Sequence, residues 1–137
     1  MTRVGVIGVG GMGACHARHV VDLAGAELAW VADPDEGAGQ ALADELGCEW
    51  VAEGMDRIDE ADALVIACPD RFHHRYVMAG LERGVPILAE KPLTVELADA
   101  REIVDTEVAL GRRLIQLGFM RVYDCLLYTS PSPRDGS

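Results

Sequence analysis

Lysine occurs at one position of this chain, in the tripeptide Glu90-Lys91-Pro92. Apart from this lysine, every residue in the combined count of lysine and arginine is an arginine. A guanidinium stays protonated, whereas the pKa of an ammonium shifts readily on burial, so a lysine can share in proton transfer. The tripeptide follows the apolar run Val85–Ala89, which has the character of a strand. Ligands gather at the carboxyl ends of strands in open α/β sheets. Lys91 is therefore the candidate catalytic residue, and the alternative is a surface lysine that happens to be alone.

A second chemical signature is the hexapeptide GVGGMG near the N-terminus, which follows the pattern G-x-G-x-x-G. It comes directly after a predicted strand and opens a predicted helix, as a dinucleotide fingerprint requires. Gly8 would permit the tight turn, Gly10 the approach of the pyrophosphate, and Gly13 the close packing of helix on strand. The N–H groups near Gly11 and Met12 would face the phosphates at the positive end of the helix dipole. A dinucleotide site is expected, rather than a merely structural turn.

Asp33 supports this site, because it ends the second predicted strand, 25 residues beyond Gly8. An acid there accepts hydrogen bonds from the adenosine ribose hydroxyls. Asp35 and Glu36 follow, with no arginine near to hold a 2′-phosphate. NAD is thus favoured over NADP. The alternative for Asp33 is a turn residue before proline.

These residues need elements to position them, and strands and helices alternate along the chain. Strands are expected at 3–8, 27–33, 48–51, 61–68, 86–89 and 113–119, with helices between them except after the third strand. Asp70 and Thr94 are expected to cap the third and fourth helices, which would end near Gly84 and Gly111. The third helix would point Phe72 inward.

Each predicted strand is too apolar to have a face in water, which indicates a parallel sheet with helices on both faces. The fold class is therefore α/β, a Rossmann-type doubly wound sheet of about six strands.

The net charge of −11 argues against a nucleic-acid partner. No apolar run reaches membrane-spanning length and no leader is recognisable, so a cytoplasmic protein is expected. The four cysteines form no CxxC pair, which predicts reduced thiols and no metal site.

The last thirteen residues, 125–137, break the alternation of elements. Their sequence, CLLYTSPSPRDGS, has no period, and its prolines cannot continue a strand or helix. It resembles the translated read-through of a sequencing adaptor, and the alternative is an ordinary flexible C-terminus. We therefore expect a Rossmann domain at 1–124 and a non-native disordered tail at 125–137, with the natural protein continuing beyond about Asp124.

Three stretches resemble one family: GVIGVGGMGACHARHV, ACPDRFHHRYVMAGLERGVPILAEKPL and LIQLGFMRVYD. The chain is similar over roughly residues 1–124 to the N-terminal domain of the Gfo/Idh/MocA oxidoreductases, the family of glucose–fructose oxidoreductase and inositol 2-dehydrogenase. Its GFMR stretch is most similar to that of inositol dehydrogenases. The resemblance implies hydride transfer between NAD and a hydroxyl carbon of a sugar or cyclitol, in a parent protein that forms a homo-oligomer.

The resemblance also implies roles at matched positions. Lys91 corresponds to the family lysine that reaches the substrate hydroxyl and the nicotinamide region, and Glu90 and Pro92 shape that turn. Cys68-Pro69-Asp70 stands where the family has Thr-Pro-Asn, whose first residues line the cofactor. Cys68 and Asp70 thus depart from the family pattern.

The histidines divide into those that match the family and one that does not. His73 matches the family histidine near the cofactor, whereas His74 does not match and is expected on the helix surface. His16, three residues after Gly13, also fits the pattern. We expect it to be buried and hydrogen-bonded for packing rather than to take part in chemistry.

A second acid–base group is implied in a following α/β domain that this chain lacks. The chain is therefore expected to bind NAD without turning over a sugar, while its intact parent is a dehydrogenase. Two other classes stay open: a non-catalytic NAD- or sugar-responsive regulator of the same fold, and an S-adenosylmethionine-dependent methyltransferase. The third glycine, Gly13, and the lysine at the Glu-Lys-Pro site favour the dehydrogenase.

Overall fold

The computed structural model describes residues 1–90, 93–94 and 96–117. Within these residues a six-stranded sheet has the order β3-β2-β1-β4-β5-β6, and every pair of neighbours is parallel. This order confirms the predicted doubly wound Rossmann-type sheet. The strands are β1 (Thr2–Ile7), β2 (Ala26–Ala32), β3 (Glu49–Val51), β4 (Ala63–Ile66), β5 (Ile87–Ala89) and β6 (Ile115–Leu117).

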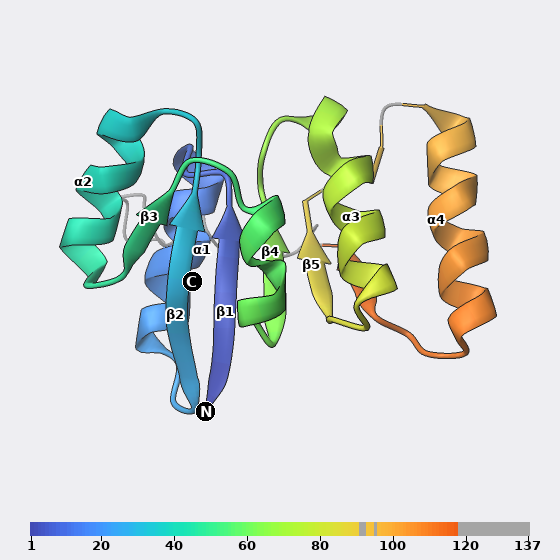
Figure 1. Ribbon diagram of the computed structural model, residues 1–137, viewed down its shortest axis with the longest axis horizontal. Helices are drawn as coiled ribbons and strands as arrows, with labels where there is room; N and C mark the ends of the chain where they lie inside the picture. The colour runs from blue at the N-terminus through green and yellow to red at the C-terminus, as the bar shows by residue number, and fades with distance from the viewer. Residues whose placement is uncertain (91–92, 95, 118–137) are drawn as a thin grey trace, which may run out of the picture.

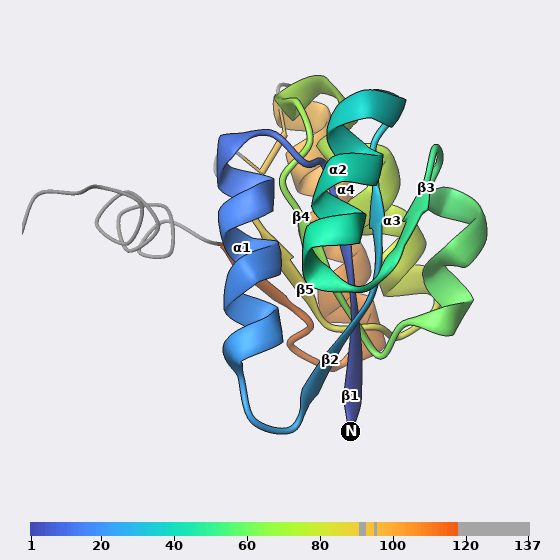
Figure 2. The same cartoon turned by 90° about the vertical axis from the view of Figure 1, so that its left-hand side faces the viewer.

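Helices lie on both faces of the sheet (Figures 1 and 2). On one face, α1 and α2 bury a core that includes Val6, Val31 and Leu42. On the other face, a separate core that includes Trp30, Ile66 and Ile103 lies under α3 and α4. The helices are α1 (Gly11–Asp22), α2 (Glu36–Leu46), α3 (His73–Glu82) and α4 (Leu97–Leu110), with 3₁₀ turns η1 (Met55–Glu60) and η2 (Asp70–Phe72). The connections from β1 to β3 and those from β4 to β6 run outward from the middle of the sheet in opposite directions. Because all of these crossovers are right-handed, the two sets of helices lie on opposite faces.

The ends of α2 show how local sequence sets these elements. The Asp35 side chain accepts a hydrogen bond from the Ala38 N–H (3.2 Å), which caps the first turn. Gly47 ends the helix with φ of 72°, a left-handed conformation that glycine adopts without a steric penalty. Gly111 ends α4 in the same way, with φ of 70°. The stop at Gly111 was predicted from the sequence.

The start of α3 differs from the prediction. Asp70 begins the 3₁₀ turn η2, and α3 itself begins at His73 without any side-chain cap. The Phe72 N–H donates to the Pro69 carbonyl (2.9 Å), which closes this tighter turn. Because a 3₁₀ turn advances fewer residues per turn than an α-helix, the inserted turn rotates Phe72 outward. Phe72 is 36% exposed, with the Arg71 guanidinium over its ring, so the expected inward position is wrong.

The start of α4 also differs. Glu96, not Thr94, is the residue before the helix, and the Thr94 hydroxyl instead donates to the Glu96 carbonyl (2.8 Å). Only Ile103 of this helix is buried, while Leu97 is 80% exposed and Val108 is 73% exposed. Figure 1 shows α4 at the outer end of the molecule beside α3. Its position there explains why a single narrow stripe of the helix contacts the core.

Cover of the sheet is uneven on the face that carries α1. A groove of about 1000 Å³ lies over β4, β5 and β6 beside this helix. Apolar side chains such as Val65 and Leu88 line the groove, and His19 and Arg113 are among its polar lining residues. The described chain therefore leaves this part of the sheet open, whereas α3 and α4 cover the opposite face of the same strands.

Two further expectations concern the cysteines and the membrane. Cys48 and Cys68 are free thiols, as expected at these two positions. Among the described residues, no helix has the length and apolar character needed to cross a bilayer. Lys91 and Pro92, the boundary near Asp124 and the tail at 125–137 lie outside the described residues.

Candidate functional site

The glycine turn after β1 is tightly enclosed at its two ends. Gly8 has φ of +97°, and a Cβ there would lie 2.6 Å from the Cys68 backbone nitrogen. A Cβ at Gly13 would lie 1.8 Å from the Gly8 carbonyl oxygen. Each distance is shorter than real Cβ contacts allow, so both positions require glycine. The structure thus gives Gly8 and Gly13 the steric roles predicted for the tight turn and for the close helix.

The middle of the turn is open instead. A Cβ at Gly10 or Gly11 would meet no atom within 4 Å, and both residues are exposed. The helix α1 has no side-chain cap and no acidic residue in its first turn. The first N–H groups of an α-helix have no acceptor within the helix. Those at Gly11 and Met12 are therefore available at the positive end of the helix dipole, which suits an anionic ligand.

Asp33 lies beside this turn. Its carboxylate accepts a hydrogen bond from the Val9 N–H (2.9 Å) and another from the Asp35 N–H (2.8 Å). The Gly8 N–H donates to the Ala32 carbonyl (2.8 Å), which ties the same two segments together. The residue thus lies where the sequence predicted, at the end of β2 and against the glycine turn. Its bond to Val9, part of the turn itself, was not foreseen.

The loop after β4 forms the neighbouring wall. The buried His73 side chain donates from Nε2 to the Cys68 carbonyl (2.9 Å), so this histidine fixes the backbone of the Cys68-Pro69 segment. Burial raises the pKa of the Cys68 thiol to about 11, although a backbone hydrogen bond and the charge of Arg75 lower it in part. A thiol with this pKa is neutral near pH 7 and offers lining surface rather than a nucleophile.

Glu90 directly follows β5 and connects two distant motifs. Its N–H donates to the Ile66 carbonyl of β4 (3.1 Å), and its carboxylate Oε2 is hydrogen-bonded to Nε2 of His16 on α1. Both residues are buried, with 8% of Glu90 and 4% of His16 exposed. The second carboxylate oxygen, Oε1, is buried and has no hydrogen-bond partner among the described residues. The predicted burial of His16 is confirmed, but its pairing with Glu90 was missed, because nothing in a spacing of 74 residues indicates it.

The candidate residues therefore gather at one edge of the sheet. The glycine turn, Asp33, the Cys68 loop and Glu90 follow the carboxyl ends of four parallel strands, β1, β2, β4 and β5. Lys91, the residue after Glu90, lies outside the described residues. The arrangement can hold an extended ligand that has phosphates near α1 and a polar group near Glu90.

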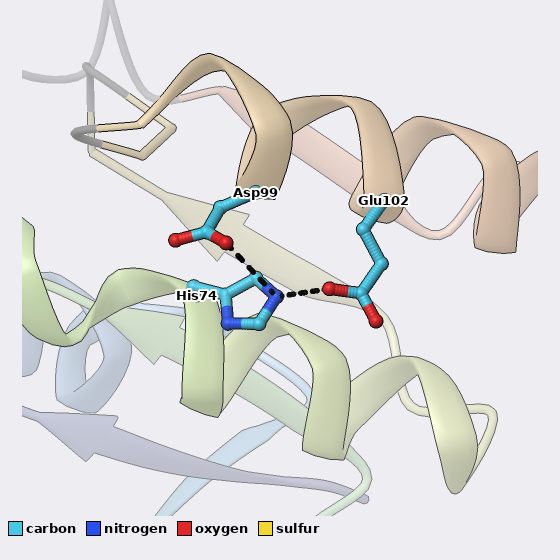
Figure 3. Close-up of side chains that lie close together, drawn as sticks. All are labelled: His74, Asp99 and Glu102. Atoms are coloured by element: carbon cyan, nitrogen blue, oxygen red, sulfur yellow. Dashed lines mark hydrogen bonds and ion pairs between the residues drawn. The ribbon is translucent and has the colours of Figure 1, made fainter.

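His74 belongs to a different surface. Figure 3 shows it extending from α3 toward Asp99 and Glu102 of α4. Its Nε2 lies 2.8 Å from the Glu102 carboxylate and 4.0 Å from that of Asp99. The side chain is 31% exposed, in agreement with the expected place on the helix surface. These contacts join α3 to α4.

Comparison with known proteins gives this geometry a family. Inositol 2-dehydrogenase 1 of Saccharopolyspora erythraea is 48% identical over 127 residues, which cover 89% of this chain and 38% of that protein. The inositol 2-dehydrogenase of Rubrobacter xylanophilus is 44% identical over 124 residues, 88% of this chain and 36% of that protein. This chain thus spans less than two fifths of the length of these curated relatives.

Solved structures agree. The myo-inositol dehydrogenase of Lactobacillus casei, solved in complex with NAD(H) and myo-inositol, superposes with a TM-score of 0.82 at 32% identity. The match covers 90% of this chain and 38% of that one. The model of the oxidoreductase family with an NAD-binding Rossmann fold, GFO_IDH_MocA, matches residues 2–119. The chain therefore belongs to the Gfo/Idh/MocA family of oxidoreductases, of which it carries the NAD-binding Rossmann domain.

Proposed function

We propose that this chain is the cofactor-binding part of an NAD-dependent dehydrogenase that acts on a hydroxyl-bearing carbon of a cyclitol or a related sugar. The observation that carries the proposal is the joint geometry of the glycine turn and Asp33 at one edge of the sheet. The inositol dehydrogenases among its relatives support the substrate class. Because the chain spans only a part of their length, turnover is proposed for the parent protein and cofactor binding for this chain.

In this proposal the pyrophosphate lies at the N-terminus of α1, against the backbone of Gly10, Gly11 and Met12. Both carboxylate oxygens of Asp33 already accept backbone hydrogen bonds, which fixes the side chain at the end of β2. A carboxylate oxygen accepts more than one hydrogen bond, so Asp33 can also bind the ribose hydroxyls. Asp35 and Glu36, exposed beside it, would repel a 2′-phosphate. NAD is therefore the proposed cofactor, rather than NADP.

The nicotinamide end would lie toward the loop after β4 and the end of β5. Cys68 and Pro69 would line it, with His73 fixing their backbone. The buried Oε1 of Glu90 is an acceptor that a hydroxyl or amide donor of a bound ligand would satisfy. Lys91, the next residue, would approach the substrate oxygen.

The chemistry proposed for Lys91 is polarisation of the substrate oxygen and a share in moving its proton. When bound, NAD supplies the acceptor for the hydride that leaves the carbinol carbon. The alcohol proton must leave the substrate in the same reaction, and an amine with a lowered pKa can accept it near neutral pH. The second acid–base group of the relay is proposed to lie in the part of the parent beyond this chain.

Several properties of the parent belong to the same proposal. We propose a cytoplasmic homo-oligomer that binds a small cyclitol or sugar, without a nucleic-acid partner, because acidic side chains dominate the net charge of −11. The domain is proposed to end near residue 124, and residues 125–137 are proposed to be non-native. Sequencing the genomic reading frame past residue 124 would test both boundaries.

The function is tested by titrating this chain with NADH, NADPH and S-adenosylmethionine, with nicotinamide fluorescence and calorimetry as readouts. We expect NADH to bind at least tenfold more tightly than NADPH and S-adenosylmethionine not to bind. Dehydrogenase activity is then assayed with a cyclitol panel, for this chain and for the full-length parent. Turnover by the parent alone is expected. NADH binding without turnover by the parent would instead favour the regulator, and selective binding of S-adenosylmethionine would favour the methyltransferase.

A further inference from the structure

The indole of Trp50, on β3, is hydrogen-bonded to the backbone of Asp33, which directly follows β2. The indole N–H donates to the Asp33 carbonyl (3.0 Å). The Asp33 N–H in turn donates to the carbonyl of Val51, the neighbour of Trp50 (3.1 Å). Pairing of β2 with β3 ends at Ala32 and Val51, so the indole continues the connection past the last pair of the ladder. The backbone of Asp33 is thus held by β3 on both sides of its Cα atom.

The position of the indole is set by the packing of α2. A Cβ at Gly39 of this helix would lie 2.1 Å from Cδ1 and 2.3 Å from Nε1 of Trp50. These distances are shorter than real Cβ contacts allow, so α2 leaves room for the indole only because position 39 is glycine. Trp50 is partly buried there and packs against the core that includes Leu42. This slot between α2 and the end of β2 directs Nε1 at the Asp33 carbonyl.

The chain contains one other tryptophan, which gives an internal comparison. Trp30 is fully buried, and its Nε1 has no hydrogen-bond partner among the described residues. Buried tryptophans usually find a partner for the indole N–H, so the core accepts Trp30 for its bulk. Trp50 is the more exposed of the two, and its single polar atom binds the residue on which the proposed ribose site depends. Packing accounts for Trp30 better than for Trp50.

We propose that Trp50 is a positioning residue: by holding the backbone of Asp33, it fixes the direction of the carboxylate that would bind the adenosine ribose. The proposal rests on the proposed function for the role of Asp33, and Trp50 itself does not contact the cofactor. The two oxygens of this carboxylate accept from the N–H groups of Val9 and Asp35. Rotation of the Asp33 backbone would break that arrangement, because the side chain is too short to compensate. Selectivity for NADH over NADPH then depends on Trp50, since only NADH offers Asp33 a free 2′-hydroxyl donor.

The first arm of the test needs no cofactor. The Val9 N–H is protected by its bond to the Asp33 carboxylate, so its hydrogen-exchange rate, measured by NMR, reports the position of that carboxylate. Trp50→Phe keeps the aromatic bulk and removes the N–H donor. A general loss of stability would accelerate exchange at Val6 of β1 as well, so the ratio of the Val9 rate to the Val6 rate is compared. We expect this ratio to rise at least fivefold in Trp50→Phe.

Trp30→Phe is the matched control, because it makes the same substitution at an indole whose N–H has no partner in the described residues. It should change the ratio less than twofold. Equal ratios in Trp50→Phe, Trp30→Phe and the wild type would overturn the proposal. Should Trp50→Phe be insoluble, Gly39→Ala displaces the indole by the added Cβ and is measured by the same criterion.

The second arm measures cofactor selectivity and separates this proposal from the proposed function. In Trp50→Phe the Kd for NADH should rise about fivefold to tenfold and that for NADPH less than twofold, whereas Trp30→Phe should leave both within twofold of the wild type. An equal rise of both constants in Trp50→Phe would show a merely structural role and overturn the proposal. If the wild-type chain bound no NADH, the proposed function would fail, and the exchange arm would still decide whether Trp50 holds Asp33. If NADH bound well and Trp50→Phe kept the wild-type selectivity, only the positioning role would be lost.

Discussion

The carboxylate of Asp33 is hydrogen-bonded to the backbone N–H of Val9, so the end of β2 holds the glycine turn in place from the side (2.9 Å). Asp33 thus supports the glycine turn and is also a candidate partner of the ribose hydroxyls. Because a hydrogen bond to a charged group contributes about 1.5–3 kcal/mol, the same substitution should affect both stability and binding.

We expect Asp33→Ala to lower the free energy of unfolding by about 1–2 kcal/mol and to weaken NADH binding at least tenfold. Chemical denaturation and NADH titration measure the two effects. Asp44→Ala, which removes an exposed acid of α2 far from the turn, is the control and should leave NADH affinity unchanged. Unaltered stability together with unaltered affinity in Asp33→Ala would contradict the assigned site.

Gly13 offers a steric test. A Cβ at this position would lie 1.8 Å from the Gly8 carbonyl oxygen. Because that oxygen belongs to the backbone, no side-chain movement can remove the clash. Gly13→Ala should therefore destabilise the domain by about 3 kcal/mol or more, at the upper end of single substitutions. Gly11→Ala, whose Cβ would meet nothing within 4 Å, should change stability by no more than about 1 kcal/mol. Thermal melts of both variants check the contrast, and similar melting temperatures would refute it.

Glu53 and Tyr76 predict a dependence of stability on acid. Burial opposes ionisation of Glu53, but bonds from the Tyr76 hydroxyl (2.6 Å) and the Met55 N–H, together with Arg75, lower its pKa overall. A carboxyl whose pKa is lower when folded stabilises the fold above its unfolded pKa of about 4.3, and that stability is lost as pH falls through the folded value. Tyr76→Phe removes one of these bonds, so it should reduce the loss of stability between about pH 6 and pH 3.

Melting temperatures across that pH range measure this effect. Glu82→Gln, on the exposed surface of the same helix, is the control and should follow the wild-type curve. An acid limb as steep in Tyr76→Phe as in the wild type would show that the tyrosine does not stabilise the ionised Glu53.

Cys68 is predicted to be a slow thiol. With a pKa of about 11, caused chiefly by burial, only about 0.1% of it is thiolate at pH 8. Alkylation at that pH should be at least tenfold slower than that of a free thiol with pKa of about 8.5, and it should accelerate as the pH approaches 11. Peptide mapping after iodoacetamide treatment gives the rate. Rapid modification at pH 7 would indicate an activated cysteine and a different role for the loop after β4.

Sequence reasoning was most successful where the relevant physics is local. The glycine spacing predicted the turn, because only a residue without Cβ fits at Gly8 and Gly13. The position of Asp33 followed from strand length, and the parallel sheet followed from strands that are apolar on both faces. The glycine stop of α4 was equally readable from sequence.

Features set by tertiary contacts were not predictable in this way. The 3₁₀ turn before α3 changes which side of the helix Phe72 occupies, and no sequence period marks such a turn. The apolar residues of α4 look like a core stripe, yet its place at the end of the sheet leaves Leu97 exposed. The pairing of His16 with Glu90 required the fold itself. The role of Lys91 stays a prediction, since the residue lies outside the described part of the chain.

The groove beside α1 marks a difference in cover between two parts of the described sheet. Within the described residues, strands β1 and β2 are packed between layers of side chains on both faces, whereas helices cover β5 and β6 on one face only. Segments with fewer buried contacts open first in native-state fluctuations. Amide exchange should therefore be slowest along β1 and β2 and faster along β5. The adenosine end of a bound dinucleotide would then lie against strands that are packed on both faces. Its nicotinamide end would lie beside β5, which we expect to open more often.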